Sequence, residues 1–312
     1  MSAKNQQAPS VVAVKPTLHR YATVNGVRLH YVEYGKGPLI VLLHGFPEYW
    51  YAWRYQLPAL AEAGYRVVAP DLRGYNLSDK PRGASQYRLE LLAGDVKGLI
   101  EALGEDSATV VGHDWGGVIA WYLAMHAPRT VRHLIILNAP HPQRYLDELR
   151  TPAQLLRSWY VLFFQLPWLP EWCIRAFGHA GLRHRLRHEP VQANAFDPAT
   201  IDAYCQALTQ PGALTAAINY YRAGLRSWFG GLRRSMHPID APTLVIWGEQ
   251  DRYLTPRLLE GLDAWVTDLT VERIGDASHW VQAEVPEQVN GLILQFLRKR
   301  RGPATRHWVQ GG

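Results

Sequence analysis

The first part of the chain alternates between apolar and polar residues, as a half-buried strand does. Residues 18–34 follow this alternation, and Asn25-Gly26 divides them into two runs. Asparagine followed by glycine fits the left-handed backbone of a two-residue hairpin turn. We therefore predict a β-hairpin at this position.

Later apolar runs show no alternation, which is typical of strands buried on both faces of a sheet. Between them, apolar residues recur with helical spacing. The strands are expected at residues 38–43, 66–70, 108–112, 131–137, 242–247 and 269–274, and the helices at 55–63, 85–103, 118–125 and 286–297. This order predicts an α/β fold, with a mostly parallel sheet, helices on both faces, and ligands bound at the carboxyl ends of the strands.

The segment from residue 141 to residue 237 interrupts this order. It contains no buried-strand run, is rich in tryptophan, and is expected to form helices at 152–165, 198–208 and 212–228. A helical insertion between two strands of one sheet would lie over their carboxyl ends, so we interpret it as a lid. The predicted divisions are an N-terminal extension (1–17), an α/β core in two parts (18–140 and 238–300), the lid (141–237) and a C-terminal tail (301–312).

The stretch from Ala108 to Gly117 predicts a sharp turn between a strand and a helix. The apolar run ends at Gly112, Asp114 stands at the tip, and Gly116 follows. Glycines are needed where strand and helix pass too closely for a Cβ atom. In the G-x-S-x-G turn of hydrolases the central residue is the nucleophile. Asp114 is therefore our candidate nucleophile.

A carboxylate nucleophile suits attack on a saturated carbon. Serine would form an ether there, which water does not cleave, whereas aspartate forms an ester that water can hydrolyse. The sequence thus predicts displacement at an sp³ carbon. The alternative is that Asp114 only caps the following helix, where a carboxylate is also favoured.

Two loops farther along the chain supply a base and an acid. Asp251 follows the strand that ends near Trp247, and His279 follows the strand that ends at Ile274. The order nucleophile, acid, histidine is that of α/β-hydrolases. We expect His279 to activate water and Asp251 to orient the imidazole and stabilise its charged form. Glu249 is the rival acid.

Ester hydrolysis also needs N–H donors for an oxyanion. In this kind of turn the residue after the nucleophile, Trp115, supplies one. The strand ending at Leu43 continues into His44-Gly-Phe-Pro47, which predicts that the Phe46 N–H supplies the second. Pro47 has no N–H and is a candidate for a cis peptide bond. The alternative interpretation of this sequence is an ordinary turn.

Tyrosines in the lid indicate which kind of leaving group the site serves. A halide needs only N–H donors, whereas an epoxide oxygen needs a proton, which a tyrosine with a pKa of about 10 carries at neutral pH. In the helix at 212–228, Tyr221 lies on the apolar stripe and Tyr220 is rotated away from it. Tyr160 stands between two other aromatic residues. Either tyrosine alone is equally consistent with packing, but together, above a carboxylate nucleophile, they favour proton donation.

Composition restricts the remaining classes of function. The chain of 312 residues is 47% hydrophobic and 19% charged, which suits one α/β domain with an insertion. No apolar run is long enough to span a membrane and the start lacks a secretory signal, so we expect a cytoplasmic protein without a membrane partner. The two cysteines, Cys173 and Cys205, are expected to be reduced and buried.

The net charge of +6 raises the question of an acidic partner. Basic residues concentrate at 183–188 and 298–301. No nucleic-acid-binding motif accompanies either run, so we interpret both as solvated surface and expect no nucleic-acid partner.

As a set, these residues resemble the α/β-hydrolase-fold epoxide hydrolases over nearly the whole chain after residue 17. The matching motifs are His44-Gly-Phe-Pro-Glu-Tyr-Trp50, Asp71-Leu-Arg-Gly-Tyr75 with Ser78-Asp79, Gly112-His-Asp-Trp-Gly-Gly117, Asn219-Tyr-Tyr-Arg222, the Asp251 loop and His279-Trp280. The family carries an aspartate nucleophile, an aspartate–histidine pair and two lid tyrosines. The resemblance implies these roles for Asp114, Asp251, His279, Tyr160 and Tyr221.

The resemblance implies an α/β-hydrolase fold with a helical cap, a hydrophobic epoxide and water as substrates, a vicinal diol as product, and no cofactor or metal. Side chains expected to line an apolar pocket are Phe46, Trp50, Trp115 and Trp280. The oligomeric state stays open, a homodimer included.

Two other functions share parts of this pattern. Haloalkane dehalogenases use the same nucleophile, but many have a polar residue where Phe46 stands and some carry their acid at the position of Asn138. Fluoroacetate-type dehalogenases usually carry arginines where this chain has Trp115 and Val118. The remaining alternative is a hydrolase-fold binding protein without turnover, which the intact set of reactive residues disfavours.

Overall fold

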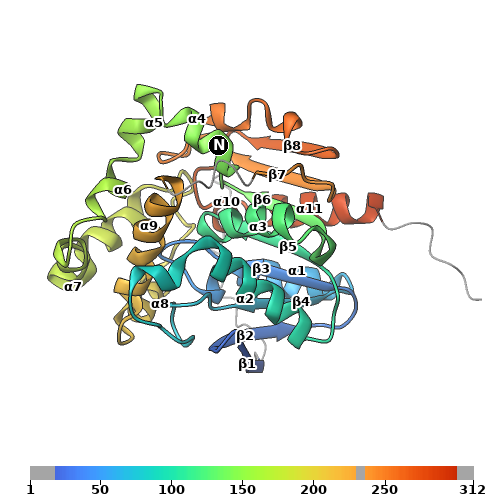
Figure 1. The fold of residues 1–312 in the computed structure, drawn as a ribbon, viewed down its shortest axis with the longest axis horizontal. Coiled ribbons are helices and arrows are strands. Elements are labelled where there is room, and N and C mark those ends of the chain that lie inside the picture. Colours follow the sequence, from blue (N-terminus) through green and yellow to red (C-terminus); the bar gives the residue numbers. More distant parts are fainter. Residues whose placement is uncertain (1–17, 230–235, 301–312) are drawn as a thin grey trace, which may run out of the picture.

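The computed structural model describes residues 18–229 and 236–300. Within them, eight strands form one sheet in the order β1-β2-β4-β3-β5-β6-β7-β8 (Figure 1). The strands are β1 (Leu18–Val24), β2 (Val27–Tyr34), β3 (Leu39–Leu43), β4 (Arg66–Pro70), β5 (Ala108–His113), β6 (Val131–Leu137), β7 (Thr243–Gly248) and β8 (Leu269–Ile274). β2 pairs antiparallel with β1 and β4, and the other neighbours are parallel. The predicted mostly parallel sheet is confirmed.

The predicted hairpin is also confirmed. Val24 pairs with Val27, and the two residues between them, Asn25 and Gly26, have φ angles of 52° and 73°. Both angles are left-handed, as a turn that matches the twist of two antiparallel strands requires.

Helices cover both faces of the sheet, because each face presents apolar side chains that water would otherwise contact. α2 and α3 pack on one face, and α1 and α11 pack on the other (Figure 1). The core helices are α1 (Gln56–Glu62), α2 (Leu89–Ala102), α3 (Trp115–His126), α10 (Val281–Glu284) and α11 (Pro286–Arg300), with short 3-10 turns η1 (Trp50–Trp53) and η2 (Ala84–Tyr87). The helix expected at 85–103 is thus η2 followed by α2.

Six helices in the described part of the segment between β6 and β7 lie beyond the carboxyl ends of the strands, on the left of Figure 1. They are α4 (Pro142–Glu148), α5 (Pro152–Arg157), α6 (Trp159–Phe163), α7 (Leu169–His188), α8 (Pro198–Thr209) and α9 (Ala213–Phe229). We refer to α4–α9 as the lid. The extension at 1–17, the tail at 301–312 and the lid residues 230–235 lie outside the described residues.

Two parts of the lid differ from the prediction. The helix expected at 152–165 is divided at Ser158 into α5 and α6, because Ser158 has φ −94° and ψ 11°, outside the helical region. The Ser158 hydroxyl lies 2.9 Å from the Tyr145 hydroxyl and accepts from the Gln154 amide at 3.0 Å. α7 was not predicted, because residues 176–179 interrupt its helical backbone.

None of the helices within these described ranges combines the length and the apolar character that crossing a membrane requires.

Candidate active site

The turn between β5 and α3 places Asp114 at the carboxyl edge of the sheet. Asp114 has φ 50° and ψ −121°, a strained conformation for a residue with a Cβ atom. The surrounding glycines make the turn possible. A Cβ atom on Gly112 would lie 2.4 Å from the Gly116 carbonyl oxygen, and one on Gly116 would lie 2.1 Å from the Leu43 carbonyl oxygen. The strand and helix therefore cross at a distance that only glycine permits.

The Asp114 carboxylate faces the loop after β3 and not the helix that it precedes. It makes no capping bond to α3. Instead Oδ1 accepts a 2.8 Å hydrogen bond from the Phe46 N–H. Gly45 allows this approach, since a Cβ atom there would lie 2.4 Å from the Asp114 Cβ. The alternative that Asp114 only caps the helix is therefore wrong. The Phe46-Pro47 peptide bond is cis, as the sequence suggested.

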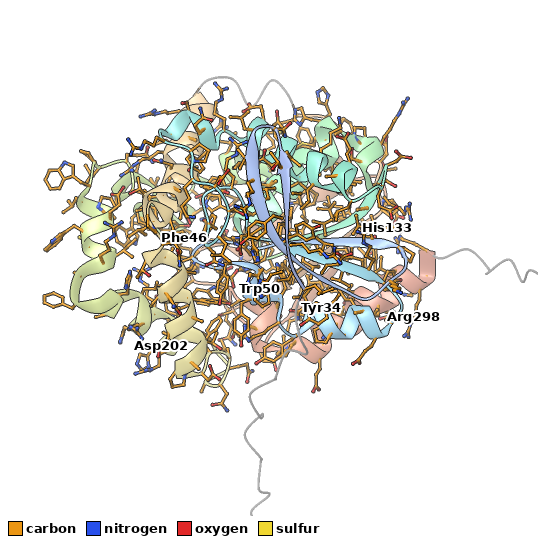
Figure 2. The ribbon with its side chains drawn as sticks, turned by 90° about the horizontal axis from the view of Figure 1, so that it is seen from below. Tyr34, Phe46, Trp50, His133, Asp202 and Arg298 are labelled. Atoms are coloured by element: carbon orange, nitrogen blue, oxygen red, sulfur yellow. The ribbon has the colours of Figure 1, made fainter. Side chains whose placement is uncertain are left out.

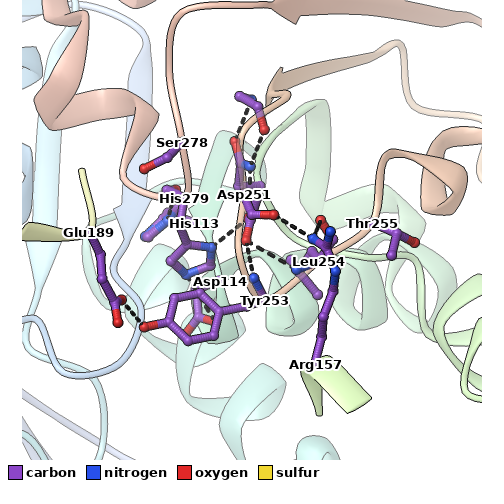
Figure 3. Close-up of polar contacts among 12 residues, drawn as sticks. His113, Asp114, Arg157, Glu189, Asp251, Tyr253, Leu254, Thr255, Ser278 and His279 are labelled. Atoms are coloured by element: carbon purple, nitrogen blue, oxygen red, sulfur yellow. Dashed lines mark hydrogen bonds and ion pairs between the residues drawn. The ribbon is translucent and has the colours of Figure 1, made fainter. Parts of the chain in front are cut away.

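His279 and Asp251 meet at the same edge of the sheet (Figure 3). The His279 Nδ1 lies 2.7 Å from Asp251 Oδ2, and its Nε2 lies 3.7 Å from Asp114 Oδ2. Asp251 also accepts hydrogen bonds from the backbone N–H groups of Tyr253 and Leu254, at 2.7 and 3.0 Å. The imidazole is thus held between two carboxylates.

Asn138 supports the Asp251 side of this arrangement. Its amide nitrogen donates to Asp251 Oδ2 at 2.9 Å, and its amide oxygen accepts from the Gly248 N–H at 2.8 Å. The rival acid Glu249 instead pairs with Arg273 on the surface at 2.5 Å. Glu249 is therefore not the partner of the histidine.

The charges around His279 control its protonation. Burial alone would lower the pKa of His279, but the carboxylates of Asp251, Asp114 and Glu48 outweigh it and raise this pKa to about 9. Burial would likewise raise the pKa of Asp251, but His279 and the hydrogen bonds from Asn138 and Tyr253 bring it below its ordinary value. The pair is therefore an imidazolium and a carboxylate at neutral pH.

Glu48 was not predicted as a site residue. Its Oε2 lies 2.8 Å from His113 Nδ1, and the His113 Nε2 lies 2.9 Å from the His279 carbonyl oxygen. Burial would raise the pKa of Glu48, but His113 and His44 bring it below its ordinary value. The only signal in the sequence was a carboxyl residue directly after His44-Gly-Phe-Pro47.

The two lid tyrosines line the same cavity as Asp114. Tyr221 is buried. The centroid of its ring lies 5.5 Å from that of Phe46 and 5.1 Å from that of Trp115. Tyr160 meets Tyr221 at 5.8 Å. Burial, together with the charge of Asp114, raises the pKa of both tyrosines well above the ordinary value. Both hydroxyls therefore keep their protons at neutral pH.

Tyr220 does not line the cavity, but the expectation that it lies off the buried side of the helix is wrong. Its hydroxyl donates to the Arg73 carbonyl oxygen at 2.7 Å, and its side chain is fully buried.

A cavity of about 390 Å³ joins these groups. It is bounded by Asp114, His279, both tyrosines, Phe46 and Trp280, and otherwise mainly by apolar lid side chains. The sequence did not single out several further lining residues, among them Phe164, Leu182 and Tyr253. Tyr253 lies two residues after Asp251, and its hydroxyl donates to Glu189 of the lid (Figure 3).

The prediction that Trp50 lines the pocket is wrong. Trp50 packs beneath the β1–β2 hairpin, with its ring 5.7 Å from that of His19, and Asp71 accepts its backbone N–H at 3.1 Å (Figure 2). Trp115 supports Tyr221 from behind and is not a lining residue.

The cysteine prediction is half right. Both thiols are free and Cys205 is buried, but Cys173 is exposed and lines the cavity. Residues 18–229 and 236–300 contain no cluster of histidine, cysteine and carboxylate side chains arranged to hold a metal ion.

Comparison with known proteins agrees with this geometry. A model of the α/β hydrolase fold family matches residues 38–286. The chain is 39% identical to epoxide hydrolase 4 of Homo sapiens, over 94% of this chain and 83% of that protein. It is 42% identical to the AB hydrolase superfamily protein YfhM of Bacillus subtilis, over 90% of this chain and 98% of that protein.

A solved structure is similarly close. A variant of an epoxide hydrolase from Bacillus megaterium, complexed with its product (R)-3-[1]naphthyloxy-propane-1,2-diol, has a TM-score of 0.83 to this chain. The two are 35% identical, over 89% of this chain and all of the other.

The sheet, the strand–turn–helix elbow and the lid define an enzyme of the α/β-hydrolase fold. Within that class the chain belongs to the epoxide hydrolase family. The resemblance drawn from the sequence motifs is confirmed.

Proposed function

We propose that this chain opens apolar epoxides to vicinal diols in two steps, through an alkyl ester on Asp114. One observation carries the proposal: a carboxylate nucleophile and two protonated tyrosines border the same cavity. A carboxylate suits attack on saturated carbon, and the hydroxyls suit a leaving oxygen.

In the first step Asp114 Oδ2 attacks an epoxide carbon, while the Phe46 N–H holds Oδ1 at 2.8 Å. The new bond joins Oδ2 to carbon, and the carbon–oxygen bond of the ring breaks. Its electron pair stays on the epoxide oxygen, which takes a proton from Tyr160 or Tyr221. The product of this step is a hydroxyalkyl ester.

In the second step His279 takes a proton from water, whose oxygen attacks the ester carbon Cγ of Asp114. The Phe46 N–H and the N–H of Trp115 then stabilise the oxyanion. When this tetrahedral intermediate collapses, the bond between Cγ and the alkyl oxygen breaks. The alkyl oxygen takes a proton from the imidazolium, and the diol is released. Hydrolysis leaves Asp114 as a carboxylic acid. Asp114 then releases its proton to solvent and the tyrosinate takes one up, so both groups return to their starting state.

Esterification itself prepares His279 for this role. The charge of Asp114 is one of the groups that raise the pKa of His279. An ester carries no charge, so the first step lowers that pKa and makes the neutral base more available. Asp251 keeps its charge throughout and stabilises the imidazolium that forms.

The cavity walls favour hydrophobic substrates. Its lining includes the rings of Phe46, Phe164 and Trp280. The Bacillus megaterium relative binds an aryloxy diol as its product. We therefore propose aryl or alkyl epoxides as substrates of this chain.

Two assays test the proposal. The first incubates the protein with an aryl epoxide and, separately, with a chloroalkane, and measures diol and halide. Diol without halide is expected, whereas halide without diol would establish the dehalogenase alternative.

The second assay is a single turnover in H₂¹⁸O with enzyme in excess. The two-step route places the heavy oxygen in the Asp114 carboxylate and leaves it out of the first diol. Heavy oxygen in that first diol would show direct attack by water and exclude the ester.

A further inference from the structure

The outer side of the lid carries a concentrated group of exposed apolar side chains. Of thirteen large apolar side chains that are exposed in the described ranges, eight fall between residues 155 and 177. We call six of them the lid patch: Leu156, Trp159, Leu162, Trp168, Trp172 and Phe177. They belong to α5, α6, α7 and the links between these helices, which follow one another along the left edge of Figure 1.

The lid core does not need these side chains. In α6 Val161 is buried and Tyr160 lines the cavity, whereas Leu162 is exposed and Trp159 is exposed although it also borders the cavity. In α7 the exposed fractions of Trp172 and Phe177 are 64% and 93%. Exposed apolar groups at this density mark a contact surface rather than ordinary surface composition.

The cavity opens within the patch. Trp159 and Cys173 line the cavity and are also exposed to solvent. If an apolar partner surface covers the patch, an apolar molecule can therefore pass from that surface through the cavity to Asp114. It does not have to cross the polar surface of the core.

The charges around the patch identify the occupant. Residues 150–189 include six arginines and two glutamates. Both glutamates are paired with arginines, Glu171 with Arg222 at 2.8 Å and Glu189 with Arg185 at 3.8 Å, and Arg183 is paired with Asp202. The exposed Arg175 and Arg187 have no carboxylate partner among the described residues. A second copy of the lid would bring the same positive charges face to face, whereas an anionic surface complements them.

We propose that the lid patch docks on the surface of an anionic phospholipid bilayer. The tryptophan and phenylalanine rings insert among the headgroups, a depth that tryptophan favours, and the arginines contact lipid phosphates. The cavity mouth then faces the bilayer, which dissolves apolar epoxides. Such peripheral binding needs no spanning helix, and it revises the expectation from the sequence that membranes are not partners. It does not depend on the proposed reaction.

Vesicle flotation tests this directly. The full chain is mixed with vesicles of phosphatidylcholine alone, or of phosphatidylcholine with phosphatidylglycerol. We expect flotation with the anionic vesicles, a blue shift of tryptophan emission, and weaker binding as salt rises. Absence of binding to the anionic vesicles would overturn the proposal.

Two sets of variants locate the surface. The triple variant Trp168→Ser, Trp172→Ser, Phe177→Ser should weaken binding at least about tenfold. Arg175→Gln and Arg187→Gln should each weaken it about fivefold. None of these side chains lines the cavity, so turnover of a water-soluble epoxide should not change.

Matched controls come from outside the lid. Val271→Ser removes an exposed apolar residue of β8. Arg298→Gln removes an exposed charge of α11, on the side away from the lid in Figure 2. Both should bind vesicles as the parent does. Equal binding by all variants would overturn the proposal, as would light scattering that shows a patch-dependent dimer without vesicle binding.

Discussion

The Nε2 atom of His279 lies 3.7 Å from Oδ2 of Asp114, which is longer than a hydrogen bond. A serine nucleophile must give its proton to the histidine, but a carboxylate is already an anion and needs no base for its attack. The separation is therefore compatible with a histidine that acts only after the ester has formed. His279 and Asp114 then serve different half-reactions.

Replacement of the histidine should separate these half-reactions. We expect His279→Gln to form the ester and then stop, because no base activates water, with turnover reduced at least about 10⁴-fold. Mass spectrometry of the protein after epoxide addition should show one substrate mass added to the peptide that contains Asp114. An inactive variant without adduct would argue against the two-step mechanism.

The lid tyrosines should share proton donation. We expect Tyr160→Phe and Tyr221→Phe each to lower kcat, and the double variant to lower it by roughly 10²–10⁴-fold, the usual contribution of a general acid. Steady-state kinetics with an aryl epoxide measures this.

The neighbouring Tyr220 is the matched control, since its hydroxyl bonds the Arg73 carbonyl and not the cavity. Tyr220→Phe should retain kcat and lose about 1 kcal/mol in the free energy of unfolding. A double Tyr160/Tyr221 variant as active as Tyr220→Phe would refute proton donation by the lid.

Protonation of His279 should stabilise the fold. Its pKa in the folded protein, about 9, exceeds the ordinary value of 6.5. This contribution is complete below about pH 6.5 and is lost as the pH rises through about 9. The shift corresponds to at most about 3 kcal/mol in the free energy of unfolding.

Urea unfolding on either side of this window measures the effect. The parent protein should lose stability between pH 6.5 and pH 9, and His279→Gln should lose much less. The same pH dependence in both proteins would show that another group is responsible.

The elbow should tolerate no Cβ atom. Gly116→Ala would place a methyl group 2.1 Å from the Leu43 carbonyl oxygen, so we expect a loss of more than about 3 kcal/mol in the free energy of unfolding. Gly291→Ala in α11 meets nothing within 4 Å and should stabilise the helix by up to about 1 kcal/mol. Thermal unfolding compares the stabilities of the two variants. A Gly116→Ala protein as stable as the parent would contradict the close contact between Gly116 and the Leu43 carbonyl oxygen.

The sequence alone determined the features that depend on local pattern. Continuous apolar runs identified the buried strands, because a strand covered on both faces has no polar positions. Gly112 and Gly116 identified the elbow around Asp114, because only glycine fits where strand and helix cross. The positions of Asp251 and His279 after parallel strands predicted that they meet, since such strands end at one edge of the sheet.

Only the tertiary structure decided which way other side chains point. Trp50 belongs to a matching motif, yet its ring packs against His19 of the hairpin instead of the cavity. Glu48 reaches the site through His113, a contact between the loop after β3 and the end of β5, which are distant in sequence. The exposure of Trp168 and its neighbours depends on how the lid helices pack, since an apolar side chain in a helical segment is equally compatible with a core and with a surface that binds a partner.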